Sequence, residues 1–167
     1  RKGVLIIPVS TLQQRLPPAS FYQGQTFVLD IGSTFDVDNT RRQLENAGYH
    51  CVDTVYEHGE YAVRGSIVDI FPMGQPLPFR IELFDDEIES LRTFDPDNQR
   101  TLDKIEQVRI LPAREFPLDT TAIRTFKARW FDFFEQDPKA CSVYTDVAQG
   151  IAPAGVEYYL PLFFSDD

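Results

Sequence analysis

Arginine and phenylalanine residues in the middle of this sequence form the pattern best suited to binding chemistry. Arg80, Glu82 and Phe84 stand at alternate positions of an apolar segment, and Arg64 stands in the segment before it. The arginine guanidinium is planar and binds a carboxylate through two hydrogen bonds, and arginine and aromatic residues are the usual anchors of protein interfaces. The pattern therefore predicts a patch of Arg64, Arg80 and Phe84 for a protein partner. Glu82 and Arg92 are expected at its rim.

Three short strands are expected to carry these side chains, because three segments are rich in β-branched and aromatic residues: Tyr61–Phe71, Phe79–Phe84 and Ile88–Phe94. Prolines and a glycine separate the first segment from the second, as a connection between strands requires. Along a strand, alternate side chains point to opposite faces of the sheet. The core face of the second strand is expected to carry its apolar residues Phe79, Ile81 and Leu83. The opposite face then carries the patch.

A structural role is the alternative for the same residues. In that interpretation Phe84 caps a second small core, because single exposed apolar side chains are normal in soluble proteins. Arg64 and Arg80 then pair with carboxylates of their own chain. The candidate carboxylates are those of Glu82, Asp85 and Asp86.

The charge of the chain disfavours nucleic acid as the partner. The formal net charge is −10, from 26 acidic and 16 basic residues, whereas non-specific nucleic-acid binding needs Lys and Arg to neutralise phosphates. A nucleic-acid-binding module, with Arg64, Arg80, Arg92 and the aromatic residues as its platform, is the competing hypothesis. It predicts DNA binding with a steep salt dependence.

Common catalytic and metal-binding patterns are not found in the sequence. It holds no phosphate loop, no dinucleotide-binding glycine pattern, no nucleophile elbow and no HExxH motif. Cys51 and Cys141 form no spaced pair, so neither a disulfide framework nor a zinc site is expected, and a reducing cytoplasm fits. Asp85, Asp86 and Glu87 suit a hard cation, but an acidic turn is expected because calcium-loop spacing is missing. We therefore expect an interaction module without catalytic residues, cofactor, metal or membrane span.

The segments before the central strands predict further elements. Gly3–Val9 is continuously apolar, which is typical of a strand buried on both faces, and Ser10–Leu16 is expected to form a short helix. Thr26–Ile31 predicts a strand, followed by a helix that Asp36 or Asp38 caps. The inward face of that helix is expected to carry Val37, Thr40, Leu44 and Ala47, with Gly48 as its left-handed stop.

The segments after the central strands complete the predicted organisation. Lys104–Leu111 is expected to close the sheet, with Val108 and Ile110 inward, and Asp119 is expected to cap a helix. The inward face of this helix is expected to carry Ile123, Phe126, Trp130 and Phe133. Ala152–Phe164 predicts a loop and a short strand. The apolar runs near both ends predict that the chain is a fragment of a larger protein.

The central stretch resembles a known family. EYAVRGSIVDIFP (60–72) and PFRIELFDDEIESLRTFDP (78–96) are similar to the UvrA-interaction domain that the excision repair protein UvrB shares with the bacterial transcription-repair coupling factor (Mfd) family. The flanking segments GVLIIPVSTLQQRLPP, LPAREFPLD and PAGVEYYLPLFFSDD are similar to the coupling factors, and UvrB itself is the alternative. The resemblance covers the chain and implies three parts. These are the end of an α/β domain (1–24), the interaction domain (25–112) and the start of a following UvrB-like subdomain (113–167).

The resemblance also implies a fold and a function. The fold would be α+β, an antiparallel sheet with one or two helices, flanked by pieces of α/β domains. The sheet would dock UvrA through Arg64, Arg80 and Phe84. The parent protein would be a cytoplasmic, ATP-driven DNA translocase that removes stalled RNA polymerase, with ATP and magnesium bound by a motor outside this chain. A C-terminal domain of the parent would cover the docking face until activation.

Overall fold

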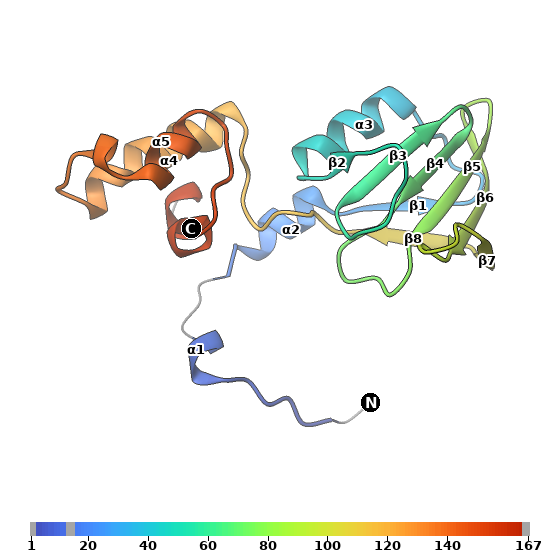
Figure 1. Cartoon of the computed structure of the whole chain (residues 1–167), viewed down its shortest axis with the longest axis horizontal. Coiled ribbons are helices and arrows are strands. Elements are labelled where there is room, and N and C mark those ends of the chain that lie inside the picture. Colours follow the sequence, from blue (N-terminus) through green and yellow to red (C-terminus); the bar gives the residue numbers. More distant parts are fainter. Residues whose placement is uncertain (1–2, 13–15, 165–167) are drawn as a thin grey trace. The chain divides into compact units, whose positions relative to one another are not determined.

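The computed structural model describes residues 3–12 and 16–164 of the chain. The chain divides into two units, which are described separately: Ser20–Arg114, and a second unit formed by Arg1–Ala19 with Glu115–Asp167. The first unit contains the β-sheets and the second contains helices (Figure 1). The predicted α+β class is confirmed, because all strand pairs but one are antiparallel.

A six-stranded sheet forms most of the first unit. Its strands in spatial order are β2 (His50–Cys51), β3 (Glu60–Arg64), β4 (Ile67–Ile70), β5 (Phe79–Phe84), β6 (Glu87–Phe94) and β7 (Thr101–Ile105). The pair β2 and β3 is parallel and the other pairs are antiparallel. A separate two-stranded antiparallel sheet pairs β1 (Phe27–Asp30) with β8 (Gln107–Ile110) (Figure 1).

Two of the predicted strands are each divided in the structure. The segment predicted as one strand over Tyr61–Phe71 is a hairpin of β3 and β4, and Gly65 in its turn has a φ of +60°. Glycine adopts this left-handed region without a Cβ clash, so the chain reverses there. The segment Lys104–Leu111 contributes to two sheets, because β7 closes the large sheet whereas β8 pairs with β1.

Helix α3 (Val37–Asn46) forms where the capping residues predict it. The Asp36 side chain accepts a hydrogen bond from the backbone N–H of Asn39 at 2.9 Å. At the other end Gly48 has a φ of +94°, and a Cβ there would meet the Arg114 side chain at 2.4 Å. Both predicted helix signals are therefore confirmed.

The two faces of the sheet carry separate cores. The main core contains the predicted inward residues of β5 together with Leu44 of α3 and the inward residues of β1 and β8: Leu29, Phe79, Ile81, Leu83, Val108 and Ile110. A smaller core contains Val55, Ala62, Phe71 and Phe94, with Val52 packed against it. Ala62 alternates with the main-core residue Tyr61, so the smaller core lies on the opposite face.

The second unit is built on helix α4 (Thr120–Phe133), which Asp119 caps as predicted by accepting from Thr121 N and Ala122 N. After α4 in the chain come η1 (Pro138–Ala140), α5 (Ser142–Ala148) and η2 (Val156–Phe163). The buried residues of α4 are Ala122, Phe126 and Trp130, whereas Phe133 is 56% exposed, so its predicted inward position is wrong. Helical spacing places Phe133 on the stripe of Phe126, but Phe133 is the last residue of α4, so its position in the pattern alone does not bury it.

Predictions for two apolar segments at the ends of the chain are wrong. Residues 3–8 are irregular and largely exposed rather than a buried strand, and among the described residues no strand pairs with them. An apolar run forms a buried strand only where neighbouring strands satisfy its backbone. Ala152–Phe164 holds the 3₁₀ helix η2, whose Phe163 ring lies 4.8 Å from that of Phe126, instead of a strand.

Two short helices complete the described elements. Helix α1 (Val9–Leu12) covers part of the predicted helix Ser10–Leu16, and residues 13–15 of that prediction lie outside the described residues. Helix α2 spans Ala19–Gln25. No helix among the described residues has the length and apolar character needed to cross a bilayer.

The buried hydroxyl of Tyr49 is expected to make the first unit less stable at alkaline pH. Its hydroxyl donates to Leu111 O at 2.6 Å, and burial raises its pKa to about 12. Below pH 10 the hydroxyl is protonated in both folded and unfolded chains. Between pH 10 and 12 it ionises more readily in the unfolded chain, so its contribution to stability is lost over that interval.

We expect Tyr49→Phe to cost about 1 kcal/mol at neutral pH, because the hydrogen bond to Leu111 O and the longer one from Met73 N, at 3.4 Å, are lost. The same variant flattens the decline in stability between pH 10 and 12. Urea denaturation followed by circular dichroism across this pH range measures both effects. The control is Tyr158→Phe, which changes an exposed tyrosine. Equal alkaline slopes for Tyr49→Phe and the unmodified chain would contradict the prediction.

Candidate protein-interaction site

A row of charged residues crosses the large sheet on the face opposite the main core. The strand register places Asp69 opposite Arg80, Arg80 opposite Arg92, and Arg92 opposite Lys104. Like charges on directly opposed positions destabilise a sheet. Asp69 is the single acidic residue in this row, and it offsets part of the positive charge.

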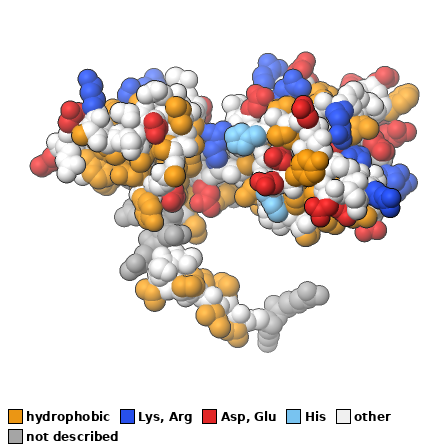
Figure 2. All heavy atoms as spheres, in the orientation of Figure 1, with side chains coloured by type: hydrophobic (Ala, Val, Ile, Leu, Met, Phe, Trp, Pro, Cys, Tyr) orange, Lys and Arg blue, Asp and Glu red, His pale blue; other side chains and the backbone are white. Residues whose placement is uncertain are grey.

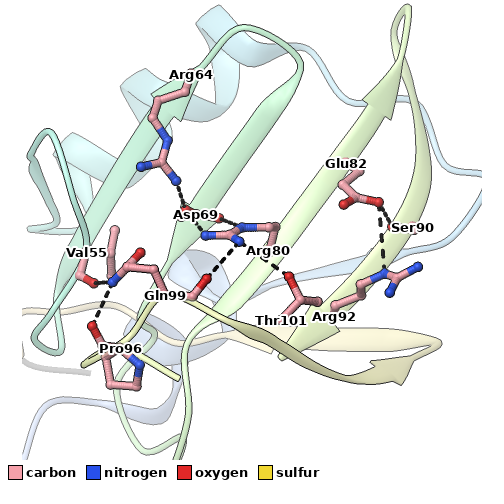
Figure 3. Close-up of polar contacts among 10 residues, drawn as sticks. All are labelled: Val55, Arg64, Asp69, Arg80, Glu82, Ser90, Arg92, Pro96, Gln99 and Thr101. Atoms are coloured by element: carbon pink, nitrogen blue, oxygen red, sulfur yellow. Dashed lines mark hydrogen bonds and ion pairs between the residues drawn. The ribbon is translucent and has the colours of Figure 1, made fainter. Parts of the chain in front are cut away.

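Asp69, at one end of this row, pairs with two arginines, although its side chain is only 1% exposed. Its Oδ1 accepts from Arg80 Nε at 2.8 Å and its Oδ2 accepts from Arg80 Nη2 at 2.9 Å. Arg64 Nη2 also donates to Oδ2. Figure 3 shows both guanidinium groups converging on this carboxylate from β3 and β5. A buried carboxylate needs such partners because its charge has left water.

The guanidinium of Arg80 makes several further contacts within the chain. Besides its fork with Asp69, its Nη1 donates to Gln99 O at 3.3 Å and to Thr101 Oγ1 at 3.4 Å (Figure 3). Its central carbon lies 4.6 Å from the ring centroid of Phe94. The hydrogen bonds to Asp69 are the main cause that raises the pKa of Arg80. With a side chain only 13% exposed, Arg80 is a largely buried cation held by several partners.

Arg64 and Phe84 are the accessible members of the predicted patch. The Arg64 side chain is 44% exposed and, among the described residues, only its Nη2 has a hydrogen-bond partner. Phe84 is 69% exposed at the end of β5 and takes no part in the smaller core. The alternative in which Phe84 caps a second core is therefore wrong.

The alternative of internal pairing is confirmed, but the carboxylates expected for it are wrong. Arg64 and Arg80 do pair with a carboxylate of their own chain, but that carboxylate is Asp69. A signal for it was present in the sequence. Asp69 interrupts an otherwise apolar strand, and alternation places it on the face of Ala62 rather than with its buried neighbours Val68 and Ile70.

The predicted rim residues contact each other. Arg92 Nε lies 4.0 Å from Glu82 Oε2, and Ser90 Oγ donates to the same oxygen (Figure 3). Both charged side chains are about a third exposed. Glu82 and Arg92 therefore offset each other's charge at the edge of the row.

A loop after β6 supports the side chain of Arg80, a role that the sequence did not predict. Asp95 Oδ1 accepts from Asp97 N at 2.9 Å, which forms a turn. Gln99 has a φ of +63°, and its Nε2 donates to Val55 O at 3.1 Å and Pro96 O at 2.7 Å (Figure 3). These bonds fix the backbone carbonyl of Gln99 that accepts from Arg80.

The acidic segment after β5 forms a turn. Asp85 has a φ of +52°, and β5 and β6 pair on either side of it. Residues 3–12 and 16–164 contain no group of three or more potential ligands arranged for a metal ion. The face of the sheet unit in Figure 2 carries acidic and basic side chains interspersed, rather than a basic area suited to phosphates.

Comparison with known proteins covers nearly the whole chain. The family described as "UvrB interaction domain" matches residues 27–116. The transcription-repair-coupling factor of Escherichia coli is 52% identical over 168 residues, 99% of this chain. That of Haemophilus influenzae is 46% identical over 169 residues, also 99% of this chain, and that of Staphylococcus aureus (strain Mu50) is 41% identical over 128 residues, 76% of this chain.

The chain is much shorter than these relatives. It spans 14%, 15% and 11% of their respective lengths. The resemblance to the coupling-factor family is confirmed, because the identity extends through both flanks of the central strands. The chain therefore belongs to the UvrB interaction domain family, and nearly its whole length is similar to transcription-repair-coupling factors.

Proposed function

We propose that the sheet unit is the docking domain through which a transcription-repair-coupling factor recruits UvrA. The observation that carries this proposal is Phe84, a large aromatic side chain that is 69% exposed on the face holding Arg64 and Arg80. Exposed aromatic and arginine residues on one face are the usual composition of an interface anchor. Membership of the UvrB interaction domain family supports UvrA as the partner.

The role of the whole protein is part of the same proposal. The chain spans a small share of its relatives, which are named transcription-repair-coupling factors. The parent protein is then a cytoplasmic DNA translocase acting on stalled RNA polymerase, and its ATP and magnesium bind outside this chain. Residues 1–24 and 113–167 belong to the adjoining UvrB-like domains and 25–112 to the interaction domain. A C-terminal domain of the parent covers the docking face before activation.

Replacing Phe84 with alanine tests the docking proposal. We expect the affinity for purified UvrA to fall by about 30-fold or more, because truncation of a desolvated aromatic anchor costs about 2 kcal/mol or more. Titration calorimetry of the variant beside the unmodified chain measures the change. The expected stability is unchanged, because the side chain is exposed in the free protein.

A matched control separates the patch from exposed aromatic residues in general. Tyr158 is 78% exposed in the other unit, so Tyr158→Ala is expected to leave UvrA affinity unchanged. Equal affinity of Phe84→Ala and the unmodified chain would overturn the assignment of this anchor. Binding of DNA with a steep salt dependence, and no binding of UvrA, would favour the nucleic-acid alternative.

A further inference from the structure

We propose that a cavity of the sheet unit binds the guanidinium group of an arginine side chain from a protein partner. The cavity has a volume of about 250 Å³ and lies where the end of α2 and the start of β1 meet the last turn of α3. All of its lining residues belong to the unit Ser20–Arg114. The lining residues are Gly24, Gln25, Thr26, Phe27, Gln43 and Asn46.

This cavity is separate from the patch of Arg64, Arg80 and Phe84. Helix α3 packs on the main core through Leu44, whereas Arg80 alternates with the main-core residue Ile81 and points to the opposite face of the sheet. The proposal therefore goes beyond UvrA docking and does not depend on it.

The polar side chains of the lining residues are uncharged and not engaged elsewhere. Gln25, Gln43 and Asn46 carry amides and Thr26 carries a hydroxyl. Among residues 3–12 and 16–164, none of these four side chains has a hydrogen-bond partner. An amide or hydroxyl oxygen accepts hydrogen bonds. Three elements therefore bring unused acceptor groups to one cavity.

Two helices end at this cavity, since α2 ends at Gln25 and α3 ends at Asn46. The last carbonyl groups of a helix have no partner within the helix, and its C-terminal end carries a partial negative charge. Gly24 has no side chain, so its backbone forms part of the wall. Arg114 donates to Glu45 O near the end of α3, but it does not line the cavity. The wall itself therefore holds no cation.

Phe27 adds an aromatic ring, which packs in part against the main core. A guanidinium is a planar cation with five N–H donors and no acceptor, and it stacks on aromatic rings. It matches a wall of oxygen acceptors, partial negative charge and one ring. A carboxylate would face acceptors and the negative ends of two helices. A neutral amide would gain nothing from the partial charges.

The size of the cavity agrees with this ligand. One water occupies about 30 Å³ in the liquid, so 250 Å³ holds more than a few waters and admits a guanidinium with part of its aliphatic stem. The ligand that the cavity fits is thus an arginine on a protein segment, with its backbone outside the cavity.

An NMR titration tests the proposal, because the side-chain amides of Gln25, Gln43 and Asn46 give their own ¹⁵N–¹H signals. The probe is N-acetyl-L-arginine amide, which reproduces an arginine within a peptide. We expect it to shift these signals saturably with a Kd of about 1–10 mM, an ordinary affinity for one small group. N-acetyl-L-glutamine amide has the same backbone and a neutral side chain. It is expected to bind about tenfold more weakly or worse, because hydrogen bonds to a charged group are the stronger ones.

Two substitutions at one exposed position change the charge of the wall in opposite directions. Gln43→Lys places a cation beside the ligand and is expected to weaken binding about tenfold or more, because like charges repel. Gln43→Glu supplies a charged acceptor and is expected to tighten binding by about 3- to 10-fold. The matched control is Gln23→Lys, which changes an exposed residue of α2 outside the lining and is expected to leave the affinity unchanged.

Several results would overturn the proposal. The absence of a saturable shift would remove the site, and equal affinity for the arginine and glutamine compounds would remove its preference for a cation. Equal binding by the Gln43→Lys variant would place the cation elsewhere on the chain. Tighter binding of free L-arginine than of the amide would overturn the assignment to a protein side chain. Because the titration uses no UvrA, its outcome is independent of the proposed docking function.

Discussion

Asp69→Ala is expected to lower the free energy of unfolding of the sheet unit by about 3–5 kcal/mol, the range for removing one partner of a buried ion pair. The loss is large because Arg80 is only 13% exposed and its Nε and Nη2 both donate to Asp69. Without the carboxylate a buried cation lacks its counter-charge. Hydrogen exchange of the β3–β6 amides, followed by mass spectrometry, reports the stability of this unit.

Two observations control the Asp69 experiment. Glu82→Ala removes a carboxylate from the same face, but one that is about a third exposed and 4.0 Å from Arg92. A partly exposed pair of this kind contributes about 0–1 kcal/mol, so its effect is expected to be small. Trp130, the single tryptophan, lies in the other unit, so its fluorescence reports on that unit. Equal destabilisation by Asp69→Ala and Glu82→Ala would contradict the role of Asp69.

Phe94→Ala is expected to destabilise the sheet unit by about 3–5 kcal/mol, the usual cost of emptying a buried phenylalanine site. Phe94 is 0% exposed and packs with Val55, Ala62 and Phe71 in the smaller core. Its ring also lies 4.6 Å from the guanidinium carbon of Arg80, so the variant removes a cation–π contact as well. Hydrogen exchange in β6 and urea denaturation measure the loss.

The matched control for Phe94→Ala is Phe84→Ala in the same sheet. Phe84 is 69% exposed, so its removal is expected to change stability by no more than about 0.5 kcal/mol. The two variants should therefore lose different properties. Phe94→Ala loses stability, and Phe84→Ala loses UvrA affinity. Comparable stability losses in both would show that Phe84 is packed in solution.

The sequence correctly predicted the features that depend on residues close together in the chain, namely the helix caps and the inward face of a strand. Asp36 and Asp119 cap helices α3 and α4 as expected, because a cap needs only the first turn of its own helix. Alternation in Phe79–Phe84 correctly assigned the core face of β5. The hairpin turn at Gly65 was not predicted, because the residues on both sides of this glycine have the same apolar, β-branched character.

Errors occurred where distant segments decide the outcome. Val156–Phe163 forms a 3₁₀ helix rather than the expected strand, since aromatic side chains of α4 pack against it. Lys104–Leu111 divides between two sheets because β1 supplies a second pairing edge for β8. The local residue pattern of these segments does not reveal that α4 and β1 would pack or pair with them.

By itself the sequence determined the family resemblance, the face of β5 that carries Arg80 and Phe84, and the helix caps. Only the tertiary structure decided that Asp69 pairs with both Arg64 and Arg80, and that Arg80 is far less exposed than Arg64 and Phe84. The physical reason is that a strand's period of two sets the face of a side chain, whereas its neighbours across the sheet depend on strand register. Register in turn depends on turns and core packing contributed by the whole unit.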